Sequence, residues 1–173
     1  LGIILGFSEE DLKKLTLGGL LHDIGKMKVS KAILNKPAKL TLEEFNEMKN
    51  HTVYGYNIIK NELKLDDDIA RVALEHQEKY SGLGYPNGLK GKEIHLNAQV
   101  AAICDVYDAL VSERVYKKAK PSHEAIKIML SEGSRSFNPF MLYKFIYLAN
   151  YKDTSNLVTQ TGMDDIQSSP HQE

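Results

Sequence analysis

Residues 97–112 read NAQVAAICDVYDALVS, and this stretch decides the fold more than any other. Its apolar residues recur on nearly all sides of a helix, rather than along one stripe. A helix of that kind lies in the centre of a bundle and is covered by other helices. We therefore expect a central buried helix at 97–112, in which Cys104 faces the core and Asp105 brings a charge into apolar surroundings.

The segments on both sides of this stretch have helical periodicity and helix-start signals. At residues 41–44, Thr41 and Glu44 can satisfy each other's backbone donors in a capping box, which opens a helix running to Ile59. No run of alternating apolar and polar residues is long enough for a strand, so the sequence predicts an all-α bundle. The other predicted helix starts are Ser8, Asp66, Pro121 and Pro139.

Two segments and the tail do not fit the helical pattern. Residues 26–40 form a lysine-rich connector, and residues 79–95 hold four of the chain's 12 glycines. The glycine-rich loop at 79–95 is longer than a simple connection between helices, and loops of this length tend to be functional. Residues 150–173 are polar and are not expected to pack, so we predict one domain over residues 1–149.

The composition excludes several classes of protein. The 173 residues carry 22 Lys and Arg against 23 Asp and Glu, a net charge of -1, which disfavours a general nucleic-acid polymer binder. A single cysteine permits no internal disulfide and favours a reducing, cytoplasmic location. No apolar stretch approaches the roughly 20 residues of a membrane helix, so no membrane contact is expected within this segment, although an anchor before its first residue stays open.

An adjacent imidazole and carboxylate, His22-Asp23, follow an apolar stretch. A divalent cation is a usual compensation for such a charge. His51, His76 and Asp105 follow at intervals of 29, 25 and 29 residues, so successive helices can present one residue each to a common centre. Each histidine taken alone is more often structural than a ligand. Nitrogen and carboxylate ligands without thiolates suit Fe, Mn, Zn or Ni equally.

At residues 22–26 the sequence HDIGK resembles the signature of the HD metal-dependent phosphohydrolase superfamily, and GLGYP at 82–86 resembles its HD-GYP branch. The similarity continues through DVYDAL at 105–110 and SERVYK at 112–117 and covers roughly residues 5 to 147. It implies a helical bundle that holds two divalent metal ions, often iron or manganese. The implied metal ligands are His22, Asp23, His51, His76 and Asp105.

The resemblance also implies an activity and roles for further residues. Characterised HD-GYP members hydrolyse cyclic di-GMP, so we expect a hydroxide held between two metal ions to yield linear pGpG, with GMP as a further product left open. Asp23 would bridge the metals and Lys26 would face the scissile phosphate as catalytic residues. The expected substrate-binding residues are Lys26, Tyr85, Pro86, Asp108, Arg114 and Lys117. A diguanylate cyclase domain is an expected partner at the loop 82–86, and a regulatory domain is expected upstream.

Two departures from the family pattern keep alternatives open. Gln77 stands where the family commonly has a histidine, which weakens one metal position, and Ser81 stands where it has an aspartate. The family's first helix, which can supply ligands to a third metal, should precede Leu1. One alternative is a degenerate HD-GYP module that senses cyclic di-GMP or docks a protein without turnover. Another is an HD phosphohydrolase acting on a different nucleotide.

Overall fold

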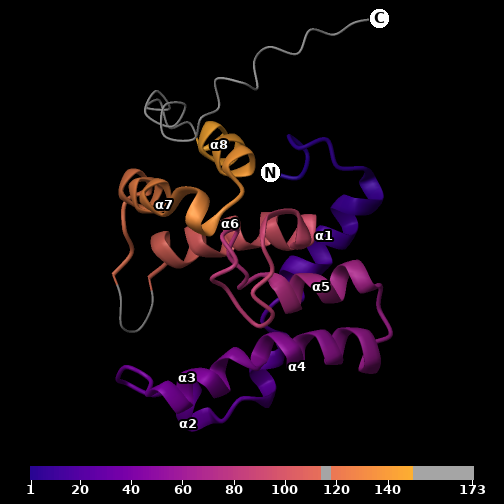
Figure 1. Cartoon of the computed structure of the whole chain (residues 1–173), viewed down its shortest axis with the longest axis vertical. Coiled ribbons are helices and arrows are strands. Elements are labelled where there is room, and N and C mark those ends of the chain that lie inside the picture. The colour runs from indigo at the N-terminus through magenta and orange to yellow at the C-terminus, as the bar shows by residue number, and fades with distance from the viewer. Residues whose placement is uncertain (114–117, 150–173) are drawn as a thin grey trace, which may run out of the picture.

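The computed structural model describes residues 1–113 and 118–149 of the chain. These residues are helical or irregular, and a single isolated β-bridge joins Ser81 to Lys90 within them. The predicted all-α class is therefore confirmed. Figure 1 shows helices α3 (Leu42–Lys49) to α8 (Pro139–Leu148) stacked in chain order along the long axis of the molecule, with α2 (Lys31–Leu34) beside α3 at one end.

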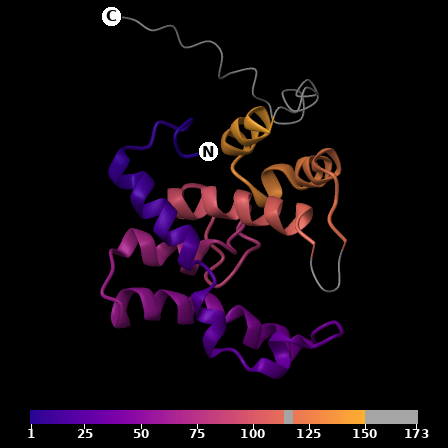
Figure 2. The ribbon, with the colours of Figure 1, turned by 180° about the vertical axis from the view of Figure 1, so that it is seen from behind.

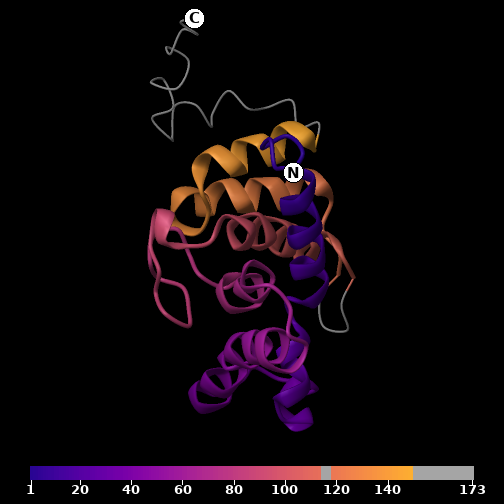
Figure 3. The same cartoon turned by 90° about the vertical axis from the view of Figure 1, so that its right-hand side faces the viewer.

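Six helices form the stack, and one further helix crosses it. The stack consists of α3 (Leu42–Lys49), α4 (His51–Asn57), α5 (Asp67–Glu75), α6 (Leu96–Val111), α7 (Ser122–Ser136) and α8 (Pro139–Leu148). Helix α1 (Glu9–Leu21) runs across α5 and α6 and packs against both, as the views from the back and the side show (Figures 2 and 3).

The predicted helix starts are confirmed. The Ser8 side chain accepts a hydrogen bond from the Asp11 backbone N–H at 3.1 Å. In the capping box before α3, Thr41 Oγ1 accepts from the Glu44 N–H at 3.3 Å, and Glu44 Oε2 accepts from the Thr41 N–H at 2.7 Å. Such caps satisfy donors that the first helical turn leaves without partners.

The structure of residues 26–62 differs from the expectation in two ways. The helix expected from Thr41 to Ile59 is interrupted at Asn50, which separates α3 from α4, and it ends in a π-helical turn, Ile58–Glu62. The connector at 26–40 is not free of helix, since it overlaps a 3-10 turn, Ile24–Lys28, and contains α2 (Lys31–Leu34). Both elements are too short for a periodic pattern to reveal them.

Two hydrophobic clusters lie on either side of the middle of the stack. The upper cluster joins α6, α7 and α8 through the buried residues Val100, Ile103, Leu110, Ala125, Ile126, Met129, Phe137, Met141, Leu142 and Ile146. The lower cluster joins α5 to the turn after α4 through Ile59, Ile69, Ala70 and Ala73. The histidines and aspartates predicted to bind metal lie between them.

Helix α6 occupies the central position that the sequence predicted, but it is not buried all round. Ile103 is fully buried, whereas Cys104 is exposed, so the prediction of a core cysteine was wrong. Successive residues of a helix point about 100° apart, and the face that carries Asp105 and Asp108 is open. That face borders the candidate site, where Asp105 approaches His22.

None of the helices within the described residues has both the length and the apolar character needed to cross a membrane.

Candidate metal centre

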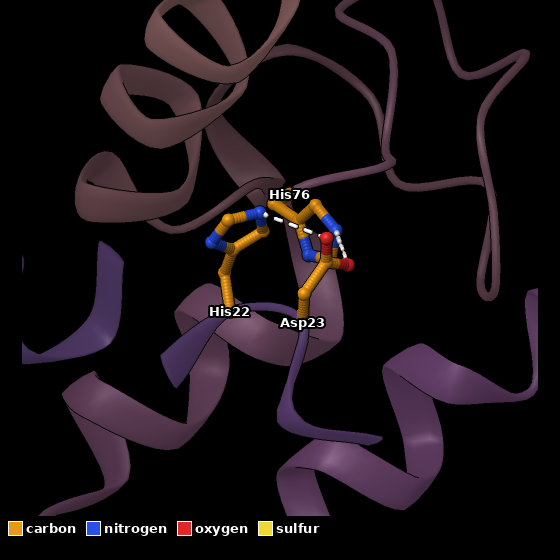
Figure 4. A group of neighbouring side chains, drawn as sticks. All are labelled: His22, Asp23 and His76. Atoms are coloured by element: carbon orange, nitrogen blue, oxygen red, sulfur yellow. Dashed lines mark ion pairs between the residues drawn. The ribbon is translucent and has the colours of Figure 1, made fainter. Parts of the chain in front are cut away.

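Residues from the ends of three helices and the middle of a fourth meet between the two hydrophobic clusters. His22 and Asp23 directly follow α1, His51 begins α4, and His76 directly follows α5. Asp105 lies within α6. His22, Asp23 and His76 could together hold a metal ion, because one ligand atom from each lies within 4.8 Å of the others. Figure 4 shows these three side chains turned toward one another.

The Asp23 carboxylate is the centre of the group. Its Oδ2 lies 3.3 Å from His22 Nε2, and its Oδ1 lies 3.4 Å from His51 Nε2 and 3.8 Å from His76 Nε2. Asp105 Oδ1 lies 3.8 Å from His22 Nε2. The structure therefore brings together all five side chains that the sequence singled out as candidate ligands.

Each histidine ring is oriented by a backbone carbonyl three residues earlier in the chain. The Nδ1 atoms of His22, His51 and His76 lie 2.7, 2.6 and 2.9 Å from the carbonyl oxygens of Gly19, Met48 and Ala73. If Nδ1 carries the proton and donates it to the carbonyl, the Nε2 lone pair is left for a ligand. Metal-binding histidines usually have such a second partner, which fixes the ring orientation.

A close backbone contact holds the His22-Asp23 segment against α4. A Cβ atom added at Gly25 would lie 1.9 Å from the His51 carbonyl oxygen and 2.4 Å from the Gly55 backbone nitrogen. Only glycine allows the two backbones to approach this closely. Gly25 therefore determines how near Asp23 comes to His51.

Unsatisfied buried atoms show that these residues fit a cation. His22 Nε2 and Asp23 Oδ1 are buried and have no hydrogen-bond partner within the described part of the chain. Buried polar atoms without partners are rare in folded proteins and call for an explanation. A divalent ion would satisfy both atoms and would balance the charge of Asp23.

The electrostatics of two of the three rings favour metal binding near neutral pH, because an imidazole must be neutral to bind a metal. Burial lowers the pKa of His51, and it lowers the pKa of His76 to about 4, so both rings are neutral at pH 7. The Asp23 carboxylate raises the pKa of His22, against the effect of burial. Burial also opposes ionisation of Asp23, but His22 and Lys26 outweigh it and hold the pKa of that carboxyl well below its usual range.

Lys26 lies in the 3-10 turn that follows Asp23. Its Nζ donates to Asp23 Oδ2 at 2.6 Å. The side chain is 42% exposed, so it is accessible to solvent. A cation in that position can approach an anionic ligand bound over the histidines.

The glycine-rich loop at 79–95 borders the metal ligands through Tyr85 and is here called the loop wall. Apart from a 3-10 turn at Gly91–Glu93 it is irregular, and its Tyr85-Pro86 peptide bond is cis. The Tyr85 ring lies 6.4 Å from the His51 ring, centroid to centroid. Burial, together with the Asp23 and Asp105 carboxylates, raises the pKa of Tyr85 to about 12, so its phenol stays protonated and can donate a hydrogen bond.

Two buried glutamates that the sequence analysis did not assign hold this wall in place. The Glu78 carboxylate accepts hydrogen bonds from the backbone N–H groups of Asn87, Gly88 and Leu89. Glu75 Oε2 accepts from the His95 N–H at 2.6 Å and so ties the start of α6 to the end of α5. The only signal in the sequence is their position on either side of His76 and Gln77, before a glycine-rich loop.

The remaining predicted residues lie around the site or outside the described part. Asp108 is one helical turn beyond Asp105 and accepts a hydrogen bond from Ser112 Oγ at 2.9 Å. Arg114 and Lys117 fall outside the described residues. Gln77 lines, with His76 and Val106, a cavity of about 230 Å³ between the loop, α6 and α7. Ser81 Oγ is buried without a hydrogen-bond partner among the described residues.

Comparison with known proteins places this arrangement in context. The HD domain family model matches residues 1–139. The cyclic di-GMP phosphodiesterase response regulator RpfG of Xanthomonas campestris is 40% identical over 136 residues, which are 78% of this chain and 36% of that protein. A cyclic di-GMP phosphodiesterase of Thermotoga maritima is 38% identical over 148 residues, which are 83% of this chain and 39% of that protein.

The fold is also similar to that of a solved structure. A cyclic GMP-AMP specific phosphodiesterase from Vibrio cholerae superposes with a TM-score of 0.65 at 19% identity, over 98% of this chain and 46% of that one. At this identity the likeness concerns the fold alone. The chain spans less than half the length of each of these three proteins.

Proposed function

The chain belongs to the HD domain family, in its HD-GYP branch, and from that premise we propose that it is a metal-dependent phosphodiesterase that hydrolyses cyclic di-GMP. The observation that carries the proposal is the convergence of three imidazole Nε2 atoms on the Asp23 carboxylate, where two buried atoms lack partners. Relatives named as cyclic di-GMP phosphodiesterases support the choice of substrate.

The residues that would hold the metal are His22, Asp23, His51, His76 and Asp105. We propose two divalent ions, iron or manganese, and Asp23 could contribute to holding both, because its two oxygens face different rings. When bound, such ions lower the pKa of water and neutralise charge on the non-bridging phosphate oxygens. The fixed Nδ1 contacts keep the rings oriented before the metal binds, so little reorganisation is needed.

The chain's own side chains would position the substrate. Lys26 would place its ammonium beside the phosphodiester, where it can leave Asp23 for the more exposed anion. Tyr85 would donate its phenolic hydrogen to a substrate oxygen, with Pro86 shaping the loop beside it. Asp108, Arg114 and Lys117 stay predicted residues that surround the substrate phosphate or hold Lys26 in position.

The test is hydrolysis by metal-loaded protein. The protein is stripped with a chelator, reloaded with Mn(II) or with Fe(II) under anaerobic conditions, and assayed for metal content by mass spectrometry. Incubation with cyclic di-GMP followed by chromatography should give linear pGpG, with GMP appearing later if the reaction continues. Full metal occupancy without product would overturn the proposal.

The same assay distinguishes the two alternatives. A non-catalytic sensing module, which Gln77 and Ser81 favour, would bind cyclic di-GMP without releasing product. A phosphohydrolase for other nucleotides would leave cyclic di-GMP intact and cleave another member of a nucleotide panel.

The partners and the location of the protein are further proposals. Leu83, in the loop at 82–86, is 74% exposed, which supports a protein contact there, and we propose a diguanylate cyclase domain as the partner. A cytoplasmic location and an upstream regulatory domain stay predictions. Pull-down of a purified cyclase domain by the wild type and not by Leu83→Ser would support the contact.

A further inference from the structure

Three side chains beside the candidate metal ligands come from two segments far apart in the sequence. Phe45 and Lys49 lie on α3, and Tyr85 lies in the glycine-rich loop. The Phe45 and Tyr85 rings are 6.2 Å apart between centroids and meet edge to face at 80°. Tyr85 also contacts the ring of His51, a candidate metal ligand. Phe45, Lys49 and Tyr85, here called the aromatic shelf, thus extend outward from the metal centre.

The aromatic shelf leaves apolar surface exposed. Phe45 is 43% exposed although it has the size and character of a core residue. Phe45 and Lys49 are four residues apart and therefore lie on the same face of α3. The Phe45 ring is exposed and contacts Tyr85, so it offers a flat surface to a ligand bound at the metal ligands.

Lys49 gives the aromatic shelf a positive charge. Its Nζ lies 4.9 Å from the Phe45 ring centroid and 5.9 Å from that of Tyr85. It donates to Asn46 Oδ1, a neutral acceptor, at 2.9 Å, and no carboxylate of the described residues forms an ion pair with it. Lys36, in contrast, contacts Glu44 at 2.6 Å. The charge of Lys49 is therefore available to an acceptor on a ligand.

We propose that the aromatic shelf binds a guanine base of the substrate, which rests on the proposed function. Phe45 supplies the stacking surface and the nearly perpendicular Tyr85 ring borders it, and base stacking on an aromatic ring tolerates any base. Lys49 supplies the selectivity, because guanine presents two acceptors, O6 and N7, on the edge where adenine presents an N6 donor beside N7. The aromatic shelf would therefore favour cyclic dinucleotides that contain guanine over cyclic di-AMP.

The chain contains a matched control pair at the other end of the stack. On α8, Phe140 is 42% exposed, and Lys144 Nζ lies 5.4 Å from its ring centroid, again four residues along one helix face. Figure 1 shows α8 and α3 at opposite ends of the molecule. The variants Phe45→Leu and Lys49→Met can thus be compared with Phe140→Leu and Lys144→Met.

The experiment measures kcat/KM of the manganese-loaded proteins for cyclic di-GMP, cyclic di-AMP and methyl p-nitrophenyl phosphate, a phosphodiester without a base. Phe45→Leu should lower kcat/KM for cyclic di-GMP by roughly 10-fold and leave the base-free ester within about 2-fold. Lys49→Met should lower the preference for cyclic di-GMP over cyclic di-AMP by roughly 10-fold. The α8 variants should match the wild type.

Two results would overturn the proposal. An equal loss on the base-free ester would show that the aromatic shelf supports the phosphate site or the fold instead of a base. Cyclic di-GMP kinetics of the α3 variants equal to those of the α8 variants would show that no base binds there.

Calorimetric titration of the same variants with cyclic di-GMP separates this proposal from the proposed function. If the wild type binds cyclic di-GMP without hydrolysing it, the proposed function fails. The aromatic shelf is then supported by weaker binding to Phe45→Leu than to Phe140→Leu, and overturned by equal binding.

Discussion

The two walls of the site each contain a close backbone contact at a glycine, Gly25 in one and Gly84 in the other, but they differ in the side-chain contacts that hold them. On the metal wall, formed by His22, Asp23, His51 and His76, backbone carbonyls fix the rings and Gly25 brings two backbones together. On the loop wall, formed by residues 79–95, the Glu78 carboxylate accepts hydrogen bonds from three backbone N–H groups, and the Tyr85 ring contacts the Phe45 ring edge to face.

This difference separates chemistry from substrate choice. Backbone contacts at van der Waals limits leave the metal wall almost no freedom, because close-packed interiors transmit small changes as strain. The loop wall has one such contact as well, at Gly84 beside Lys79, but the Glu78 carboxylate adds side-chain contacts that can be altered without moving a helix. We expect changes in the metal wall to abolish metal binding, and changes in the loop wall to alter substrate binding while the metal stays.

The largest effect is expected from Asp23→Asn. The amide keeps the shape of the side chain but removes the charge that faces three imidazoles and Lys26. Metal content should fall to background, and hydrolysis of cyclic di-GMP should fall by more than roughly 100-fold, beyond the loss typical of residues that only support a ligand. Asp11→Asn, which makes the same charge change in the exposed first turn of α1, should retain both. Full metal content in Asp23→Asn would contradict the assignment.

Gly25→Ala tests the close backbone contact within the metal wall. The added Cβ would collide with the His51 carbonyl oxygen, so the free energy of unfolding should fall by about 2 kcal/mol, and metal affinity should fall with it. Gly19→Ala is the matched control, since a Cβ there meets nothing within 4 Å, while its carbonyl still accepts from His22. Urea denaturation and metal titration measure both quantities. Equal stability of the two variants would show that the close contact at Gly25 does not require a glycine.

Glu78→Gln tests the loop wall. An amide oxygen and an NH₂ group cannot accept the three N–H donors that the carboxylate holds, so the loop should loosen. We expect the KM for cyclic di-GMP to rise roughly 5-fold, about 1 kcal/mol, faster tryptic cleavage after Lys79 or Lys90, and unchanged metal content. Glu93→Gln, which loses only one exposed backbone contact of the same loop, is the control. Loss of metal in Glu78→Gln would show that the two walls do not act independently.

The smallest effect concerns the pH dependence of the metal-free protein. Burial lowers the pKa of His76 from 6.5 to about 4. Between these two pH values the unfolded chain binds a proton at this ring and the folded chain does not. This group therefore costs stability as pH falls, about 1 kcal/mol between pH 7.5 and 5.5. His22 acts in the opposite direction, since its pKa is raised.

Comparison with His76→Gln isolates the contribution of His76. Urea denaturation of the chelator-treated proteins at both pH values should give a shallower loss of stability in the variant. Identical losses in the two proteins would show that the buried ring does not resist protonation.

The sequence by itself predicted the all-α class, the starts of the longer helices and a set of candidate metal ligands, but not the break at Asn50 or the short helix α2. The capping box at Thr41 and Glu44 and the cap at Ser8 depend on neighbours three residues away, so local chemistry specifies them. His22-Asp23 was legible because a charge followed an apolar stretch. His51, His76 and Asp105 could be predicted as candidate ligands because their spacing suits successive helices.

Only the tertiary structure decided which atoms meet. The convergence on Asp23, the contact at Gly25, the role of Glu78 and the pairing of Phe45 with Tyr85 join residues that lie 9 to 53 positions apart along the chain. The exposure of Cys104 likewise followed from which face of α6 its neighbours leave open. Such contacts are set by how helix faces pack, which periodicity along a single chain does not specify.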